Sequence, residues 1–146
     1  MGRYYHGDIE GKFWFGVQDS RDAEHFGGKE TPIIEIFEDE DGNKSTDQVG
    51  STFSFTKSDL AIIDHELERL NGLLGEAKEM MDEFFSEREY YNRSELKEYL
   101  NLEGEDVAKE AVAQGCLVMY ARILLGEKIK ACIEEKGSCT FDADFY

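Results

Sequence analysis

The feature that most constrains the fold is a helical repeat of apolar residues in the middle of the chain. Between positions 63 and 84 the apolar residues follow one another at alternating steps of four and three. They are Ile63, Leu67, Leu70, Leu74, Ala77, Met81 and Phe84. Steps of this size place side chains on one face of an α-helix, and that face must be covered by another element. The sequence therefore predicts one long amphipathic helix, capped by Thr56 or Ser58 with Asp59 in its first turn.

Two glycines interrupt this predicted helix. Gly72 and Gly75 each cost roughly 1 kcal/mol relative to alanine inside a helix. Two explanations stay open at this point. Either another backbone approaches the helix closely at the glycines, or the helix kinks there.

Two further helices are expected after this segment. A short one is predicted near Ser94–Leu100, with Asn92 or Ser94 as its cap. A long one is predicted between Glu105 and Lys136, where Gly137 is placed to stop it. Polar residues nearly vanish from Ala111 to Leu125, so this helix should be surrounded by other elements.

Apolar and polar residues alternate near both ends of the chain, with the period of two that is typical of β-strands. The alternating or strand-like segments are residues 3–5, 13–17, 33–37, 53–56 and 139–145. The first two flank turn residues 7–11 and are predicted to form a hairpin. The polar segment 38–50, which contains Asp41-Gly42, supplies a second turn.

The order of four strands, three helices and a final strand predicts an α+β fold. We expect an antiparallel sheet of N-terminal strands plus a C-terminal strand, packed by two long helices and one short helix. A chain of about 150 residues is ordinarily one domain. We therefore predict a single domain over 1–146, with a β-rich part at 1–56, a helical part at 57–137 and the C-terminal strand at 138–146.

The composition is that of a folded protein with a large negative charge. There are 33 Asp and Glu residues against 16 Lys and Arg, a net charge of −17, and 40% of the residues are hydrophobic, enough for a core. No apolar stretch approaches the roughly 20 residues that cross a bilayer, and we identify no targeting segment. We expect a soluble protein that contacts no membrane and is repelled by nucleic acid.

The cysteines indicate a reducing compartment. Cys116, Cys132 and Cys139 form no C-x-x-C pair, and their odd number leaves one thiol over. We expect a cytoplasmic protein without a disulfide framework, in which two of the three thiols lie in helices. A bridge between Cys132 and Cys139 stays open as an alternative.

One short motif raises the question of metal chemistry. Residues 7–11, Gly-Asp-Ile-Glu-Gly, resemble the Gly-Asp-x-His-Gly element of metal-dependent phosphoesterases, but Glu10 stands in place of the histidine. In a continuous strand, His6, Asp8 and Glu10 would share a face and could hold a divalent ion. The glycines favour a hairpin turn instead. We therefore predict no catalytic residue, no metal and no cofactor.

The negative charge is concentrated in one part of the chain. Residues 60–110 contain 15 acidic and six basic residues, a net charge of −9. A stripe of carboxylates lies along the predicted helix beside its apolar face, and these are the residues we predict to bind a partner: Glu76, Glu79, Asp82, Glu83 and Glu87. They recur about every 5.5 Å, whereas duplex DNA carries one charge per about 1.7 Å. To approach that density the stripe would have to converge with the acidic cluster at 38–41, with the one at 103–106, or with a symmetry mate.

These features predict a small acidic, non-enzymatic protein-binding module. Its sharpest version is an inhibitor that mimics nucleic-acid charge and occupies a basic cleft of a nucleic-acid-binding protein. In composition, though through no motif, the chain resembles the nucleic-acid-mimicking inhibitors that phages use against restriction and CRISPR nucleases. One alternative is a homo-oligomeric accessory protein, such as a homodimer, joined through the apolar helix face or through Tyr4, Tyr5, Trp14 and Phe26. A less favoured alternative is a small metal-dependent hydrolase around Asp8 and Glu10.

Overall fold

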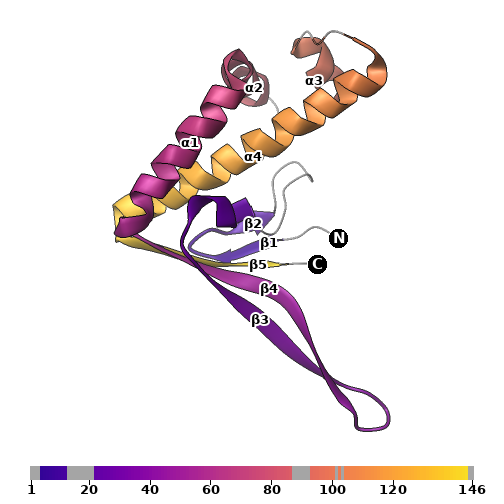
Figure 1. Cartoon of the computed structure of the whole chain (residues 1–146), viewed down its shortest axis with the longest axis vertical. Helices are drawn as coiled ribbons and strands as arrows, with labels where there is room; N and C mark the ends of the chain where they lie inside the picture. Colours follow the sequence, from indigo (N-terminus) through magenta and orange to yellow (C-terminus); the bar gives the residue numbers. More distant parts are fainter. Residues whose placement is uncertain (1–3, 13–21, 87–92, 101, 103, 145–146) are drawn as a thin grey trace.

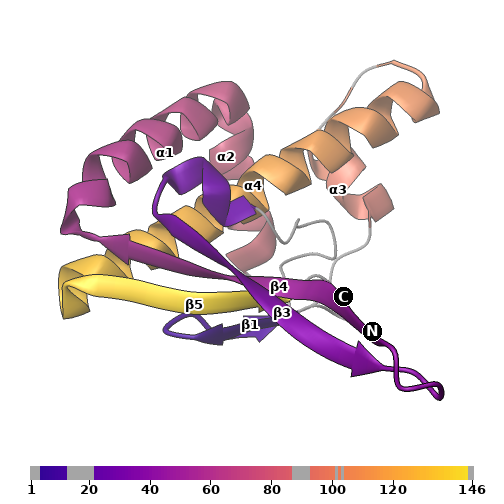
Figure 2. The same ribbon diagram turned by 60° about the horizontal axis from the view of Figure 1, so that its bottom comes forward.

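The computed structural model describes residues 4–12, 22–86, 93–100, 102 and 104–144. It has the predicted α+β architecture: an antiparallel sheet with its helices gathered on one face (Figure 1 and Figure 2). The strands are β1 (Tyr4–Gly7), β2 (Gly11–Lys12), β3 (Lys29–Glu38), β4 (Lys44–Thr56) and β5 (Ser138–Asp144). The helices are α1 (Leu60–Leu74), α2 (Glu76–Ser86), α3 (Arg93–Tyr99) and α4 (Asp106–Lys136), with short 3-10 turns η2 (Asp22–Phe26) and η3 (Lys57–Asp59).

The C-terminal strand occupies the middle of the sheet, whose order is β2-β1-β5-β4-β3. Strand β5 pairs with β1 through Tyr5 and Ala143, and with β4 through Phe53 and Phe141. The Phe141 ring stacks on Phe55, with 6.1 Å between the ring centroids. These side chains face the helices and are buried, because alternate residues of a strand point to the same face. The final strand therefore joins the N-terminal strands to the rest of the core, as predicted.

The predicted helix over positions 63–84 is two helices rather than one. Gly75, at φ 55° and ψ −128°, ends α1, and its N–H donates a hydrogen bond to the Asn71 carbonyl at 2.9 Å. Gly72 stays inside α1, and a Cβ atom added at either glycine would meet no atom within 4 Å. Of the two explanations left open by the sequence, the kink is correct, since the helix is interrupted at Gly75. The close approach of another backbone to the glycines is wrong. The apolar face itself was predicted correctly, since all its members are buried except the half-buried Ala77.

Helix α4 packs on the same face of the sheet as α1 (Figure 2) and carries the largest part of the helical core. Its side chains Leu117, Ile123 and Leu125 are fully buried. The prediction that the whole apolar stretch is surrounded is wrong near the start of the helix, where Val112 is half exposed. Gly137 ends the helix as predicted, in the left-handed conformation that lets the chain turn into β5.

The N-terminal hairpin is present as far as the described residues extend. Tyr5 pairs with Gly11 and Tyr4 with Lys12, so residues 8–10 form the predicted turn. The strand predicted at Phe13–Val17 lies outside the described residues. Within the described part of the chain, no helix combines the length and apolar character that crossing a membrane requires.

Candidate functional site

The β3–β4 hairpin extends away from the body of the molecule as a two-stranded arm (Figure 1). We define this arm as residues 34–48, beyond a shift of strand register between Ile33 and Ile34. Three large apolar side chains are exposed on it: Ile36 at 69%, Ile34 at 54% and Phe37 at 46%. Exposed side chains of this size in one place are uncommon on a monomeric protein and mark interaction sites.

The turn at the tip of the arm is closed by hydrogen bonds to Asp39. The Asp39 carboxylate accepts hydrogen bonds from the N–H groups of Asp41, at 3.0 Å, and Asn43, at 2.8 Å. Gly42 completes the turn at φ 81°, a backbone conformation that glycine adopts readily. This turn fixes the pairing of Ile36 with Thr46 and of Ile34 with Gln48. The two isoleucines consequently share one face of the arm.

The arm combines its apolar residues with a strong negative charge. Its acidic residues are Glu35, Glu38, Asp39, Glu40, Asp41 and Asp47, and all are exposed. Lys44 is the single basic residue of the segment, which gives a net charge of −5. Strand β3 is also the last strand of the sheet, so one row of its backbone hydrogen-bonding groups has no neighbouring strand within the described residues.

The sequence predicted a strand at 33–37 but a turn over the whole of 38–50, and it missed the arm as a surface. The turn prediction is wrong beyond residue 43, because β4 already begins at Lys44. The segment 33–37 looks like half of a buried hairpin when it is considered alone. The signal lay in its partner, since residues 44–48, Lys-Ser-Thr-Asp-Gln, contain no large apolar side chain. A strand pair of which only one strand is apolar cannot form a core, because each apolar side chain needs apolar neighbours.

Four of the five residues of the predicted acidic stripe lie on α2. Glu76, Glu79 and Glu83 are exposed. Glu87 lies outside the described residues.

Asp82 connects α2 to α4 instead of forming part of the open stripe. Its carboxylate accepts hydrogen bonds from Lys78 Nζ, at 2.6 Å, and from the Tyr120 hydroxyl, at 2.7 Å. Burial opposes ionisation, but these two donors outweigh it and lower the pKa of Asp82. Burial together with the Asp82 carboxylate raises the pKa of Tyr120. Asp82 therefore has a structural role, and its charge is largely balanced by Lys78.

The acidic cluster at the tip of the arm does not converge with the stripe on α2. Helix α2 and the tip of the β3–β4 arm lie at opposite ends of the molecule (Figure 1). Glu103, in the third cluster, lies outside the described residues. The density of charge that would imitate a duplex is therefore not reached by α2 and the arm together.

Most of the residues suggested for self-association are buried in the hydrophobic core. The apolar face of α1 and α2 packs within the core, and Tyr5 and Phe26 are both buried. Tyr4 is exposed, and Trp14 lies outside the described residues.

The structure does not bring His6, Asp8 and Glu10 together as a metal site. The His6 ring nitrogen Nε2 lies 3.2 Å from the Asp144 carboxylate, on the neighbouring strand. Asp8 turns toward the end of α4, where its carboxylate accepts a hydrogen bond from the Thr140 N–H at 2.9 Å and lies 3.4 Å from Lys136 Nζ. The Thr140 hydrogen bond lowers the pKa of Asp8; burial opposes this effect, and Lys136 adds to it.

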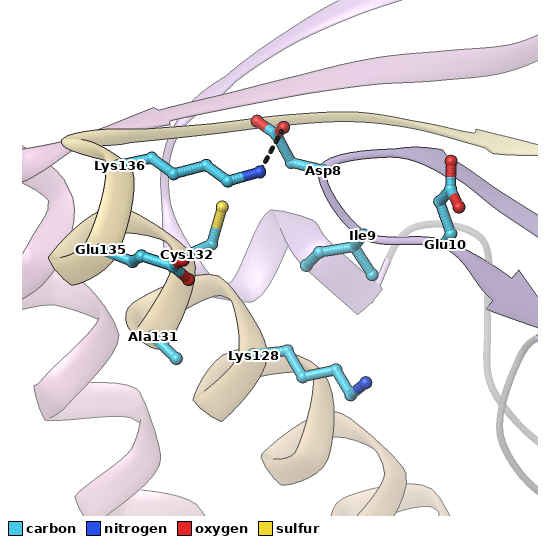
Figure 3. Close-up of a pocket in the computed structure, with 8 residues that line it drawn as sticks. All are labelled: Asp8, Ile9, Glu10, Lys128, Ala131, Cys132, Glu135 and Lys136. Atoms are coloured by element: carbon cyan, nitrogen blue, oxygen red, sulfur yellow. Dashed lines mark hydrogen bonds and ion pairs between the residues drawn. The ribbon is translucent and has the colours of Figure 1, made fainter.

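Asp8 borders a pocket of about 230 Å³ between the β1–β2 turn and the last turns of α4 (Figure 3). Its lining also includes Glu10, Cys132, Glu135 and Lys136. Figure 3 shows the Cys132 sulfur, the Lys136 ammonium and the Asp8 carboxylate pointing toward one another.

Two of the three free thiols meet beside this pocket. Cys132, in the last turns of α4, and Cys139, in β5, are both buried, and the Cys132 thiol donates a hydrogen bond to the Ser138 carbonyl at 3.4 Å. The two sulfur atoms and an Asp8 carboxylate oxygen all lie within 4.8 Å of one another. Burial raises the pKa of the Cys139 thiol. The cysteines are thiols, so the alternative of a Cys132–Cys139 bridge is not what the structure contains.

Comparison of the chain with protein-family models, with curated proteins and with solved structures found no match.

Proposed function

We propose that this protein is a small acidic, non-enzymatic protein-binding module that engages a basic protein surface through its β3–β4 arm. The observation that carries the proposal is the exposure of Ile34, Ile36 and Phe37 on an arm that lies outside the packed body. Burying such side chains against a partner removes apolar surface from water, at about 25 cal/mol per Å².

The charges around these apolar residues favour a basic partner. Six carboxylates and one lysine within residues 34–48 repel nucleic acid and acidic proteins and speed the approach of a positively charged surface. In this arrangement Ile34 and Ile36 on one face of the arm, and Phe37 on the other, supply affinity, because buried apolar anchors dominate interface energies. The carboxylates supply selectivity and a rate of association that falls with salt.

The proposed partner is therefore a protein with an apolar groove rimmed by Lys and Arg. Clefts that bind nucleic acid have such basic rims, so an inhibitor of a nucleic-acid-binding protein is the specific version of this function. Glu76, Glu79 and Glu83 form a second acidic surface on α2 that a large partner could reach, and Glu87 follows them in the sequence. The three free thiols fit a reducing compartment such as the cytoplasm.

The test compares two sets of substitutions in affinity capture from the native host at low and high salt. Replacing Ile34, Ile36 and Phe37 together by Thr keeps strand propensity and removes the apolar anchors. Replacing Glu76, Glu79 and Glu83 together by Lys reverses the α2 surface and is the matched control. We expect the arm variant to lose the salt-sensitive partner and the α2 variant to retain it.

Binding of the purified partner would then be measured by calorimetry. Loss of the anchors should weaken it by at least about tenfold, since a single anchor residue is worth 1–2 kcal/mol or more. Capture that is unchanged in the arm variant, or lost only in the α2 variant, would show that the arm is not the binding surface.

Light scattering over a concentration series tests the homo-oligomer as the competing function. A second copy pairing along β3 would bring the carboxylates of two arms together, and this repulsion disfavours it at low salt. If the unaltered chain forms a dimer and the arm variant does not, the arm is a dimer interface rather than a binding surface for a different protein.

A further inference from the structure

We propose that Asp8, Cys132 and Cys139 form a binding site for one thiophilic divalent cation of the Zn²⁺ class. The observation is the convergence of two thiol sulfurs and a carboxylate oxygen within 4.8 Å, from the β1–β2 turn, the end of α4 and the start of β5. This site lies in the body of the molecule, apart from the arm, and does not depend on the function proposed above.

The donor set matches the coordination chemistry of zinc. Zn²⁺ binds Cys sulfur at about 2.3 Å and carboxylate oxygen at about 2.0–2.2 Å, in tetrahedral geometry. Two sulfurs on one tetrahedral ion lie about 3.8 Å apart, as follows from those bond lengths. Donors that are within 4.8 Å of one another need to move inward by only about half an ångström each to reach this separation. Two soft ligands also select zinc-like ions over Mg²⁺ or Ca²⁺.

Local structure holds the three donors in place before any ion binds. Gly137 reverses the chain between the two cysteines, so that Cys139 begins β5 beside the last turns of α4. Asp8 is fastened to β5 twice, since its N–H donates to the Thr140 carbonyl at 3.0 Å and its Oδ2 accepts from the Thr140 N–H. Hydrogen bonds of this kind orient a metal ligand from the outer shell. Little conformational freedom is therefore lost when the ion binds.

Lys136 is the group that the ion must displace. Its Nζ lies 3.4 Å from Asp8 Oδ1, and its side chain is 53% exposed, so the ammonium can move into solvent. A divalent ion with two thiolates and one carboxylate leaves a net charge of −1, which Lys136 can still balance from the outer shell.

Binding conserves charge and changes no oxidation state. Two S–H bonds break, two S–metal bonds form and two protons pass to solvent, while the Asp8 carboxylate is already ionised. The pocket beside Cys132 and Asp8, about 230 Å³ in volume, leaves room for water as the fourth ligand (Figure 3). A site with three protein ligands keeps one coordination position open to water, whereas a structural zinc site has four protein ligands.

Co²⁺ is the probe, because thiolate coordination gives it a charge-transfer absorption that carboxylate coordination lacks. We expect one equivalent of Co²⁺, added to the reduced full chain, to produce this absorption at an intensity that corresponds to two thiolates. Zn²⁺ should then displace it. This measurement uses the unaltered protein and does not depend on whether any variant folds.

Substitutions assign the ligands. Cys132→Ala and Cys139→Ala should each remove at least half of the absorption, and Asp8→Asn should weaken binding at least tenfold. Cys116→Ala is the matched control, since Cys116 lies elsewhere on α4, and it should bind Co²⁺ as the unaltered chain does. Circular dichroism checks that each variant is folded.

Three results would overturn the proposal. They are absence of charge-transfer absorption in the reduced chain, loss of that absorption in Cys116→Ala, and retention of the full absorption in a folded Cys132→Ala/Cys139→Ala double variant. If the reduced chain binds no ion but forms a Cys132–Cys139 disulfide in air, the pair is redox-active and the metal site is likewise rejected.

Discussion

The ring of Phe26 lies so close to Gly126 that a Cβ atom at position 126 would meet ring atoms Cε1 and Cζ at 2.5 Å. Leu67 of α1 approaches the same point, at 2.8 Å from that Cβ position. Phe26 is completely buried and ends the short turn η2, so this contact fixes η2 between α1 and α4. The absence of a side chain at position 126 is therefore what allows three elements to meet in one place.

Gly126→Ala is expected to destabilise the protein by about 1–3 kcal/mol. Neither the buried ring nor the helices can move away freely, so the added methyl group overpacks the core. Urea unfolding measures the change in the free energy of unfolding. Gly115→Ala is the control on the same helix, because a Cβ atom there meets nothing within 4 Å. It should stabilise by up to about 1 kcal/mol through helix propensity, and equal effects of the two would contradict the packing described here.

The two glycines of the predicted helix should respond in opposite ways. Gly75→Ala forces alanine to φ 55° and ψ −128°, which is strained for an L-residue, and should destabilise by about 1–2 kcal/mol. Gly72→Ala lies within α1 in open space and should stabilise by up to about 1 kcal/mol. Thermal unfolding of both variants checks this. Stabilisation by Gly75→Ala would mean that α1 and α2 form one continuous helix.

Asp22→Asn is expected to destabilise by about 3 kcal/mol. Asp22 is 1% exposed and accepts a hydrogen bond from Arg122 Nη2 at 3.1 Å, so its neutralisation removes the hydrogen-bonded charge partner of a largely buried guanidinium. The control is Asp64→Asn, which removes an ion pair of similar length with Lys130 at the surface. That change should cost less than about 1 kcal/mol. Similar losses in the two variants, measured in urea, would argue against a buried pair.

Asp82 should stabilise the protein at neutral pH and lose this effect in acid. Its pKa in the folded chain is below the ordinary value of 3.8, so the folded state releases the proton more readily than the unfolded state. The contribution is thus complete above about pH 4 and disappears as the pH falls through the lowered pKa.

The variant Asp82→Asn should accordingly be less stable than the unaltered chain by about 1 kcal/mol at pH 7, a value reduced by solvent screening at this half-exposed site. The difference should shrink below pH 4. Glu83→Gln removes the same charge from an exposed neighbouring position and should change stability by less than about 0.5 kcal/mol. A stability difference for Asp82→Asn that is constant from pH 7 to pH 3 would contradict this role.

Much of the fold could be predicted because it depends on neighbours in the sequence. The apolar face at 63–84, the helix stop at Gly137 and the final strand all follow from spacing and from residue types within one or two turns. The break at Gly75 was harder, because a glycine inside a helix costs only about 1 kcal/mol and either outcome is compatible with that value.

The candidate sites were much less accessible to sequence reasoning. The acidic residues of α2 could be found from their spacing. The hydrogen bond from Tyr120 that removes Asp82 from the open stripe could not be predicted, because 38 positions separate the two residues. Ile36 and Phe37 are exposed because the arm extends beyond the part of the sheet that the helices cover (Figure 1). Their hydrophobicity alone would have placed them in the core.

The sequence by itself determined the type and order of the helices and strands, the apolar faces and the excess of negative charge, since these depend on local conformation and composition. Only the tertiary structure decided which side chains meet. It places Asp8 beside Cys132 and Cys139, Asp22 beside Arg122, and the Phe26 ring against Gly126. Contacts between distant positions form when the sheet and the helices pack together. The energy of that packing comes from the whole core, so no single segment of the sequence specifies it.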